Sequence, residues 1–291
     1  MIPTNLHIGW AETLVGALVA AGVTDIVVSP GSRSTPLVLA AAARTNVRCT
    51  VVVDERSAAF FALGQARASG KPSVLICTSG TAAAHYFPAV IEASTAFVPL
   101  VVLSADRPWE DRETGASQTI DQVKMFGRYV RLFVDIGPPD PSPAAFKALT
   151  RIAAQSVHAA LAPTPGPVHL NVQLRKPLEP AIVNGREAWE DVRDALVARA
   201  PTAISLSTAP MVDEPTLDRI ADACARASRG VIVAGPLPIA TNADREAIFA
   251  LARTLGFPLL VEHTSQLRFG ATNDIPLFAS FDVHLRNAAF R

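Results

Sequence analysis

The sequence predicts an α/β protein with a doubly wound parallel sheet, followed by part of a second α/β domain. Short runs of β-branched apolar residues alternate with Ala- and Leu-rich segments over about the first 175 residues. Several of these runs are apolar throughout, which is typical of strands buried on both faces. The connecting loops are short and marked by Gly or Pro, as in repeated βαβ units.

The individual elements follow from this alternation. We expect strands at 24–29, 48–54, 72–78, 98–106, 130–136 and 167–174, where β-branched residues gather. We expect helices between them at about 10–21, 35–45, 56–69, 81–96, 119–126 and 142–161. The helical segments supply the crossovers that parallel strands need.

The composition changes after this region and indicates the domain organisation. We expect a first domain at 1–180, a linker rich in Pro and charge at 181–200, and a second α/β domain at 201–291. The last region contains only two clear strands, "VIVAGPLP" and "FPLLVEH". Two parallel strands rarely close a core, so we expect the second domain to be incomplete.

The totals exclude several classes of protein. Lys and Arg together number 26, as do Asp and Glu, so the net charge is zero and binding to nucleic acid is not expected. The three cysteines show no CxxC spacing, which favours a reducing cytoplasm over a disulfide or zinc framework. We expect no signal peptide in the first residues and no membrane insertion, because no apolar run is long enough.

Ligands of parallel sheets bind outside the carboxyl ends of the strands, and four loops there carry reactive groups. The first is "SPGSRSTP" (29–36), in which Gly31 permits a tight turn and Thr35-Pro36 suits a helix start. Arg33 and the helix N-terminus would attract a carboxylate or phosphate. An ordinary βα turn is the alternative.

The second loop, in "VVVDERSA" (51–58), places Asp54 and Glu55 after a strand that we expect to be central. Either carboxylate is a good helix cap. The alternative is a partly buried carboxylate, whose raised pKa suits proton sharing. The third loop, Ser79-Gly80-Thr81, is a tight turn with free backbone N–H groups but without the lysine of a P-loop.

The fourth loop, "SADRPWEDRETGASQTIDQ" (104–122), is long, polar and rich in both charges. Loops of this length within a compact domain are usually functional. Arg107 follows the strand directly and, together with Arg33, would suit a dicarboxylate. The alternative is a solvated loop with internal ion pairs.

Together these loops resemble the N-terminal half of the 2-succinyl-5-enolpyruvyl-6-hydroxy-3-cyclohexene-1-carboxylate (SEPHCHC) synthases, a thiamine-diphosphate enzyme family of menaquinone biosynthesis. The resemblance is dense over about residues 8–175, and "ADRP…GASQTIDQ" is its specific part. It implies a transferase that decarboxylates 2-oxoglutarate and adds the resulting carbanion to isochorismate. It also implies a pyrimidine-binding first domain and a homodimer or homotetramer, with each site built between two subunits.

The resemblance also implies roles for particular residues. Glu55 would be the catalytic glutamate that hydrogen-bonds N1′ of the aminopyrimidine ring and so helps the cofactor lose its C2 proton. Three residues would lie near the cofactor: Thr78, Ser79 and Gly80. Four would line the substrate pocket: Ser32, Arg33, Arg107 and Gln118.

The sequence departs from the family in one respect. The family's third domain carries a GDG…N motif that binds Mg²⁺ and the diphosphate, and no GDG occurs in these 291 residues. We therefore expect the diphosphate-binding domain and the metal ligands to lie outside this chain, and the chain alone to be inactive. The alternative is a non-catalytic domain that binds carboxylates or only dimerises. An acetolactate synthase or decarboxylase type of enzyme is disfavoured by the Arg107 loop.

Overall fold

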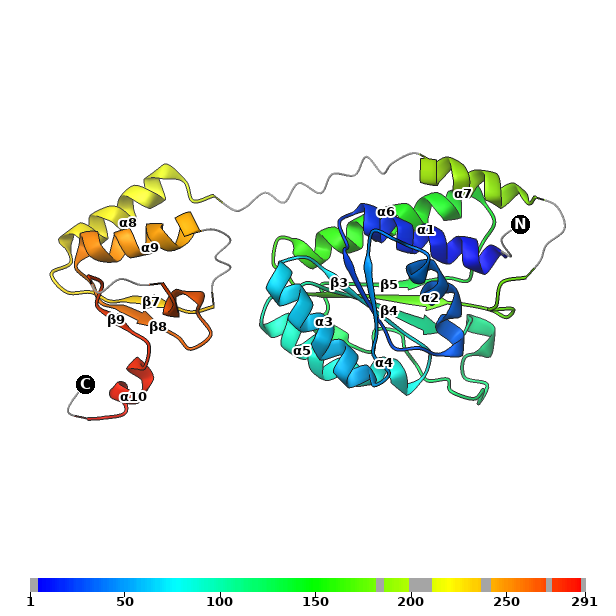
Figure 1. Cartoon of the computed structure of the whole chain (residues 1–291), viewed down its shortest axis with the longest axis horizontal. Coiled ribbons are helices and arrows are strands. Elements are labelled where there is room, and N and C mark those ends of the chain that lie inside the picture. The colour runs from blue at the N-terminus through cyan, green and yellow to red at the C-terminus, as the bar shows by residue number, and fades with distance from the viewer. Residues whose placement is uncertain (1–4, 182–185, 199–210, 237–241, 271–273, 289–291) are drawn as a thin grey trace. The chain divides into compact units, whose positions relative to one another are not determined.

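The computed structural model describes residues 5–181, 186–198, 211–236, 242–270 and 274–288. The chain divides into two compact units, Met1–Thr208 and Ala209–Arg291 (Figure 1). The predicted domain boundary at 200/201 therefore lies eight residues before the boundary between these units, within a segment outside the described residues.

A six-stranded sheet forms the centre of the larger unit. Its strands are β1 (Asp25–Val28), β2 (Arg48–Val51), β3 (Ser73–Cys77), β4 (Leu100–Asp106), β5 (Leu132–Ile136) and β6 (Pro167–Gln173). They are ordered β2-β1-β3-β4-β6-β5, and every neighbouring pair is parallel. All six predicted strands are present. However, β2 is an edge strand with mostly exposed residues, so the expectation that it is central was wrong.

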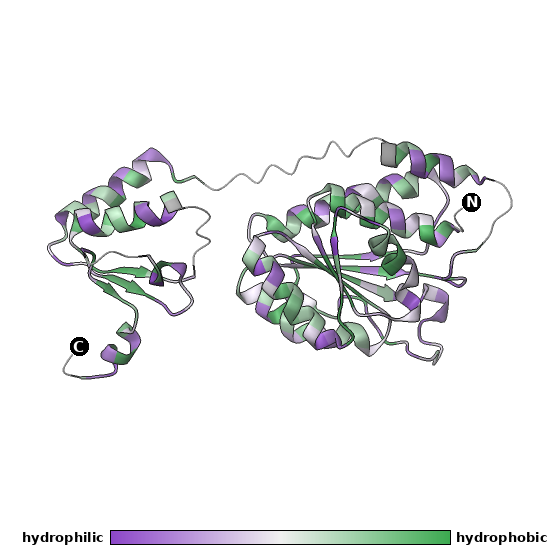
Figure 2. Ribbon diagram, in the orientation of Figure 1, coloured by the Kyte–Doolittle hydropathy of each residue, from purple (hydrophilic) through white to green (hydrophobic). Residues whose placement is uncertain are grey.

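Helices cover both faces of this sheet, which confirms the doubly wound fold. On one face lie α1 (Leu6–Ala20), α2 (Thr35–Ala42), α6 (Pro143–Leu161) and α7 (Ala188–Ala198). On the other lie α3 (Glu55–Ser69), α4 (Thr81–His85) and α5 (Phe87–Thr95). Figure 2 shows the strands mostly green, because their side chains face a hydrophobic layer on either side. Short 3₁₀ turns η1 (Ser32–Ser34), η2 (Trp109–Asp111) and η3 (Gly127–Tyr129) lie in the connections.

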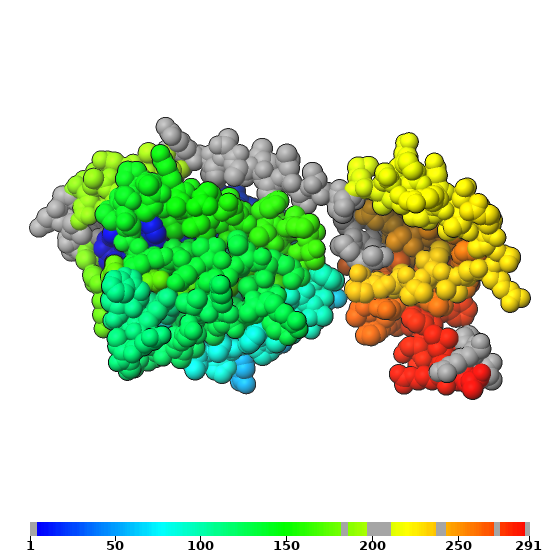
Figure 3. All heavy atoms as spheres, turned by 180° about the vertical axis from the view of Figure 1, so that it is seen from behind, coloured from blue at the N-terminus to red at the C-terminus, as the bar shows by residue number. Residues whose placement is uncertain are grey.

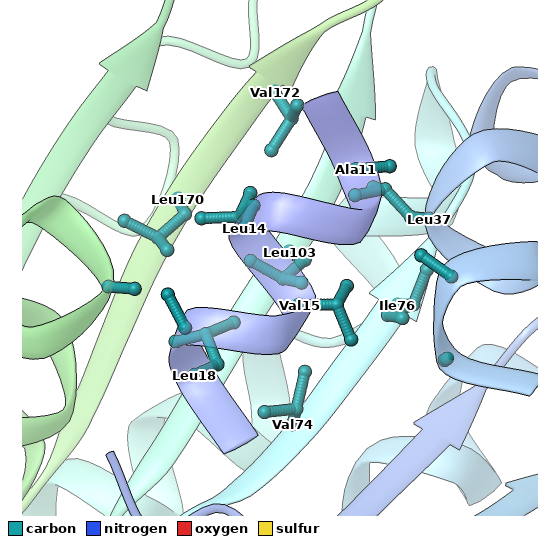
Figure 4. Close-up of a cluster of buried hydrophobic side chains, with 14 of the residues drawn as sticks. Ala11, Leu14, Val15, Leu18, Leu37, Val74, Ile76, Leu103, Leu170 and Val172 are labelled. Atoms are coloured by element: carbon teal, nitrogen blue, oxygen red, sulfur yellow. The ribbon is translucent and has the colours of Figure 1, made fainter. Parts of the chain in front are cut away.

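Helix α1 forms the middle of the first hydrophobic layer. Its side chains Leu14, Val15 and Leu18 are fully buried and point toward the sheet (Figure 4). They meet Leu103 of β4 and Leu170 of β6, which are also fully buried. Burying each leucine contributes roughly 1.5–3 kcal/mol relative to exposure, so this helix anchors the strands whose ends carry the candidate site.

Helix α7 lies within the range 181–200 for which we expected a linker. Its Trp189 is only 3% exposed and stacks on Phe146 of α6, with ring centroids 6.2 Å apart. Phe146 in turn meets Trp10 of α1 edge to face at 5.2 Å. The apolar periodicity of "AWEDVRDALV" belongs to a helix that packs on the first unit, so this part of the range is not a free connection.

Two predicted helices differ from the structure. The range 81–96 contains two short helices, α4 and α5, which meet at Tyr86. The helix expected at 119–126 is absent, because Gln118 and Lys124 both have positive φ angles, 55° each, that no α-helix accommodates. The side chain of Asp121 instead accepts a hydrogen bond from the backbone N–H of Val123, as in an Asx turn.

The smaller unit is a three-stranded parallel sheet with helices. Its elements are α8 (Glu214–Arg226), β7 (Ile232–Ala234), α9 (Asn242–Leu255), β8 (Leu259–Val261), η4 (Gln266–Arg268), β9 (Leu277–Phe278) and α10 (Phe281–Leu285). Both predicted strands are present, and β9 is an additional one. Phe249, Leu259 and Val261 belong to its small core.

In the larger unit, segments that follow β4 in the chain, coloured green, form most of the face shown in Figure 3.

Candidate functional site

The four loops singled out in the sequence follow β1, β2, β3 and β4, so they meet at the carboxyl edge of one parallel sheet. The first and third loops are in direct contact. The backbone N–H of Arg33 donates to Thr78 Oγ1 at 3.3 Å. A Cβ atom on Gly31 would lie 2.5 Å from Thr78 Cβ, so only glycine allows this approach.

Asp54 and Glu55 in the second loop have different surroundings. Asp54 is the N-cap of α3, and its Oδ1 accepts a hydrogen bond from the Ser57 backbone N–H at 2.9 Å. This bond, with a smaller contribution from Arg56, lowers the pKa of Asp54 to about 2. Glu55 is half-buried in the first turn of α3, and its carboxylate has no hydrogen-bond partner among the described residues. The capping role therefore belongs to Asp54, which leaves Glu55 available for a ligand.

The Glu55 carboxylate lies near two buried groups on the β3 side. Burial raises the pKa of the Cys77 thiol, and the charge of Glu55 adds to that rise. Burial likewise raises the pKa of Tyr86, whose hydroxyl donates to Ile76 O at 3.0 Å and lies 3.1 Å from Ser29 Oγ. The hydroxyl of Tyr86 is thus held by β1 and β3 and remains protonated.

The third and fourth loops are joined by reciprocal hydrogen bonds. Ser79 Oγ donates to Gln118 O at 3.1 Å, and Gln118 Nε2 donates to Ser79 O at 3.1 Å. Gly80 has a φ of +83°, and a Cβ atom there would lie 2.9 Å from Gln118 Cγ. Gly80 is therefore required by both its backbone conformation and its neighbour.

Gln122 connects these loops to the sheet beneath them. Its Oε1 accepts from the backbone N–H of Gly80 at 2.8 Å. Its Nε2 donates to Asn171 Oδ1 at 3.0 Å and to Ala105 O at 3.3 Å. Gln122 is 1% exposed, so water does not reach the polar groups around it. Its amide therefore supplies the hydrogen bonds that water would otherwise make to them.

Polar side chains on the central strands continue this network. Ser104 Oγ donates to Asn171 Oδ1 at 2.8 Å and lies 2.7 Å from His169 Nε2. Burial lowers the pKa of His169 to about 3, so its ring is neutral. These residues were not predicted from the sequence, although a serine, a histidine and an asparagine inside apolar strands are a signal of a buried network.

A cavity of about 440 Å³ opens at this edge. Arg33 and Arg107, both predicted, line it together with Arg175 and Lys176, which the sequence analysis missed. The other lining residues are Pro108, Glu110, Asp111, Ala116 and Ser117. Arg175 and Lys176 follow β6 as the other loops follow β1 to β4, and this position is the signal that would have identified them.

The hydrogen-bond partners of the two predicted arginines are neutral. Arg33 is 4% exposed, and its Nη1 donates to Leu174 O at 2.5 Å. Arg107 Nη2 donates to Ser117 O at 2.6 Å, and its Nε donates to Thr119 Oγ1 at 3.2 Å. Carbonyl and hydroxyl oxygens fix the guanidinium groups without cancelling their charge, which favours an anionic ligand.

Arg112 of the same loop is paired differently. Its Nη2 lies 2.8 Å from Asp106 Oδ2, and its Nη1 lies 3.1 Å from Asp135 Oδ2. The fourth loop thus combines its two predicted features. Arg112 forms internal ion pairs, as expected for a solvated loop, whereas Arg107 forms none among the described residues and remains available for a carboxylate. The other two predicted substrate residues, Ser32 and Gln118, are exposed at this edge but do not line the cavity.

Within the described part of the chain, no cluster of three or more His, Cys, Asp or Glu residues is arranged to hold a metal ion. No helix there is both long enough and apolar enough to cross a membrane.

Comparison with known proteins identifies the class first. Residues 9–125 match the family described as "Thiamine pyrophosphate enzyme, N-terminal TPP binding domain". This part of the chain is therefore similar to the N-terminal domain of the thiamine pyrophosphate enzymes. A solved thiamine diphosphate-dependent 4-hydroxybenzoylformate decarboxylase from Rhodococcus jostii RHA1 has the same fold, with a TM-score of 0.69, 18% identity, and coverage of 87% of this chain and 44% of the decarboxylase.

Relatives over nearly the whole chain are more specific. A SEPHCHC synthase of Sorangium cellulosum is 53% identical over 99% of this chain and 47% of its own length. Those of Geobacillus kaustophilus and Haloquadratum walsbyi are 46% and 44% identical, over 95% and 98% of this chain and 47% and 46% of their own lengths. The chain is thus related to the SEPHCHC synthases and spans about half the length of the curated relatives it matches.

Proposed function

We propose that the chain supplies the pyrimidine-side half of the active site of a SEPHCHC synthase. In this function, 2-oxoglutarate is decarboxylated and the remaining four-carbon unit is transferred to isochorismate in menaquinone biosynthesis. The observation that carries the proposal is one sheet edge with two uncompensated guanidinium groups, Arg33 and Arg107, and one unpaired carboxylate, Glu55. These groups match two anionic substrates and an aminopyrimidine ring.

The surroundings of Glu55 fit the aminopyrimidine ring of thiamine diphosphate. Its carboxylate is a free acceptor in the first turn of α3, and its charge acts on Cys77, two residues before the turn at Ser79-Gly80. A half-buried carboxylate in this position accepts a hydrogen bond from a protonated ring nitrogen and stabilises it. Bound thiamine diphosphate supplies the carbanion chemistry, and Glu55 holds the proton at N1′.

The neighbouring loop completes the proposed cofactor contact. Thr78, Ser79 and Gly80 would hold the ring from this side. Hydrogen bonds with Gln118 and Gln122 fix their turn. Mg²⁺ and the groups that bind the diphosphate remain part of the proposal, with their ligands outside this chain. The first unit is then the pyrimidine-binding domain, and the second is part of a central domain.

We assign substrate binding to Ser32, Arg33, Arg107 and Gln118. The two arginines bind substrate carboxylates in the cavity. Ser32 and Gln118, exposed at the same edge, contact the substrate from outside the cavity wall.

We propose a homodimer or homotetramer in the cytoplasm. Exposed apolar side chains on β2 and α3, among them Val51, Phe60 and Phe61, support burial against another subunit. The free cysteines Cys49, Cys77 and Cys224 support a reducing compartment.

A chimeric enzyme tests this function. The 291 residues are joined to the remaining part of the Sorangium cellulosum synthase, and product formation from 2-oxoglutarate and isochorismate is measured with thiamine diphosphate and Mg²⁺. We expect turnover that requires both substrates. A folded chimera that binds dicarboxylates but gives no product would favour the alternative of a non-catalytic carboxylate-binding domain.

A further inference from the structure

Arg175 differs from the other arginines of the cavity because its partner is a carboxylate. Its guanidinium faces Glu110 with two nitrogens, Nε toward Oε1 and Nη2 toward Oε2, the latter pair 3.1 Å apart. This bidentate geometry is the one in which arginine binds a ligand carboxylate. Glu110 lies in η2 of the fourth loop, only three residues after Arg107.

The cavity carries more positive than negative charge. Its lining has four cationic side chains (Arg33, Arg107, Arg175 and Lys176) and two carboxylates (Glu110 and Asp111), a difference of two charges. Lys176 has no ion pair among the residues that the structure describes. Arg33 Nε is buried and has no hydrogen-bond partner in the same described set. The cavity therefore has unused capacity for an anion with more than one charge.

The ion pair of Arg175 and Glu110 is readily exchanged. The two side chains are 42% and 37% exposed, and pairs with this exposure contribute little to stability. A ligand carboxylate that also reaches Arg33 or Arg107 gains contacts that Glu110 lacks, so it replaces Glu110 at small cost.

We propose that Arg175 and Lys176 bind the second carboxylate of a small dicarboxylate whose first carboxylate lies on Arg33 and Arg107, and that Glu110 occupies the second position until the ligand displaces it. A monocarboxylate satisfies Arg33 and Arg107 and leaves Glu110 in place. Arg175 and Glu110 thereby make the cavity selective for dianions. This inference deepens the proposed function and rests on it for the substrate class.

Titration calorimetry on the 291-residue chain without thiamine diphosphate tests the proposal. The probes are two dianions, 2-oxoglutarate and isochorismate, and one monoanion, 2-oxobutyrate. Arg175→Gln should weaken at least one dianion roughly fivefold or more and leave 2-oxobutyrate within about twofold. Glu110→Gln removes the competing carboxylate and should tighten the same dianion roughly two- to fivefold.

Two matched controls change the same charges elsewhere on the larger unit. Arg151→Gln and Glu92→Gln, on α6 and α5, should alter each dissociation constant by less than about 1.5-fold, because screening limits distant surface charges. Tryptophan fluorescence checks that each variant is folded. Unchanged or weaker dianion binding by Glu110→Gln overturns the proposal. Equal weakening of all probes by Arg175→Gln, or no measurable dianion binding by the wild type, does so as well.

The outcome is separable from that of the proposed function. An active chimera together with a Glu110→Gln variant that does not bind more tightly refutes only the role of Glu110 and Arg175. Selective dianion binding with an inactive chimera refutes only the synthase function.

Discussion

Replacing Gln122 by alanine tests whether this side chain fixes the candidate site. The substitution leaves the buried backbone N–H of Gly80 without its acceptor, and it removes the amide donated to Asn171 and Ala105. An unsatisfied buried donor costs about 1–3 kcal/mol. The missing side-chain volume adds about 1 kcal/mol. We therefore expect a loss of about 2–4 kcal/mol in the free energy of unfolding.

Urea denaturation followed by tryptophan fluorescence measures this loss. All three tryptophans, Trp10, Trp109 and Trp189, belong to the larger unit, so the signal reports on that unit alone. Trp10 and Trp189 lie in its core and report directly on global unfolding. The slope of the transition should stay unchanged, because the same surface becomes exposed.

Gln155→Ala on α6 is the matched control, since among the described residues its amide hydrogen-bonds only with the exposed Arg151 side chain. It should change the free energy of unfolding by less than about 0.5 kcal/mol. A loss below about 0.5 kcal/mol for Gln122→Ala would refute the reasoning, because it would mean that the hydrogen bonds of the Gln122 amide do not stabilise the folded state.

Four further substitutions test the larger unit. Gly31→Ala forces a Cβ atom to within 2.5 Å of Thr78, so it should cost about 1–3 kcal/mol in unfolding experiments and weaken dianion binding. Gly64→Ala, where nothing lies within 4 Å on helix α3, should instead stabilise by about 0.4–1 kcal/mol. Burial lowers the pKa of His169 to about 3 from a usual 6.5, so unfolding takes up a proton between these values. The free energy of unfolding should therefore fall as pH drops through this range, and His169→Asn should flatten the dependence; an unchanged slope would contradict a neutral buried ring. Arg112→Gln leaves its buried carboxylate partner on β4 uncompensated and should destabilise by about 2–3 kcal/mol, measured by urea denaturation. A loss below about 0.5 kcal/mol would contradict that account.

The strands of the sheet were predictable because each is a run of β-branched residues, and this local pattern does not depend on the position of the strand in the sheet. The loops at its carboxyl edge were also predictable, because parallel strands place the loops that follow them at the same edge of the sheet. Arg33 and Arg107 were therefore found from the sequence as partners in one cavity.

The position of each strand within the sheet could not be predicted from the sequence. The valines before Asp54 are as apolar as the residues of the central strands, yet β2 pairs on one side only. Val51 at the end of β2 and Val53 just after it are both exposed. The division of labour between Asp54 and Glu55 also required the structure, because either carboxylate is an acceptable cap.

Tertiary contacts decided the elements that local pattern misjudged. The segment 119–126 is not helical, since Gln122 is drawn into the buried network and the residues at 118 and 124 turn the chain. Arg175 gave no motif of its own. It belongs to the cavity only because β6 lies beside β4, a pairing between segments about 65 residues apart.

The most direct measurement is product formation by the chimera carrying Glu55→Gln, compared with Asp54→Asn. If Glu55 holds the ring proton, its replacement should lower the rate by about 10²-fold or more while the urea midpoint stays near that of the wild type. Asp54→Asn, which retains a capping side chain, should keep most of the rate. Retention of more than half of the rate by Glu55→Gln would contradict the account.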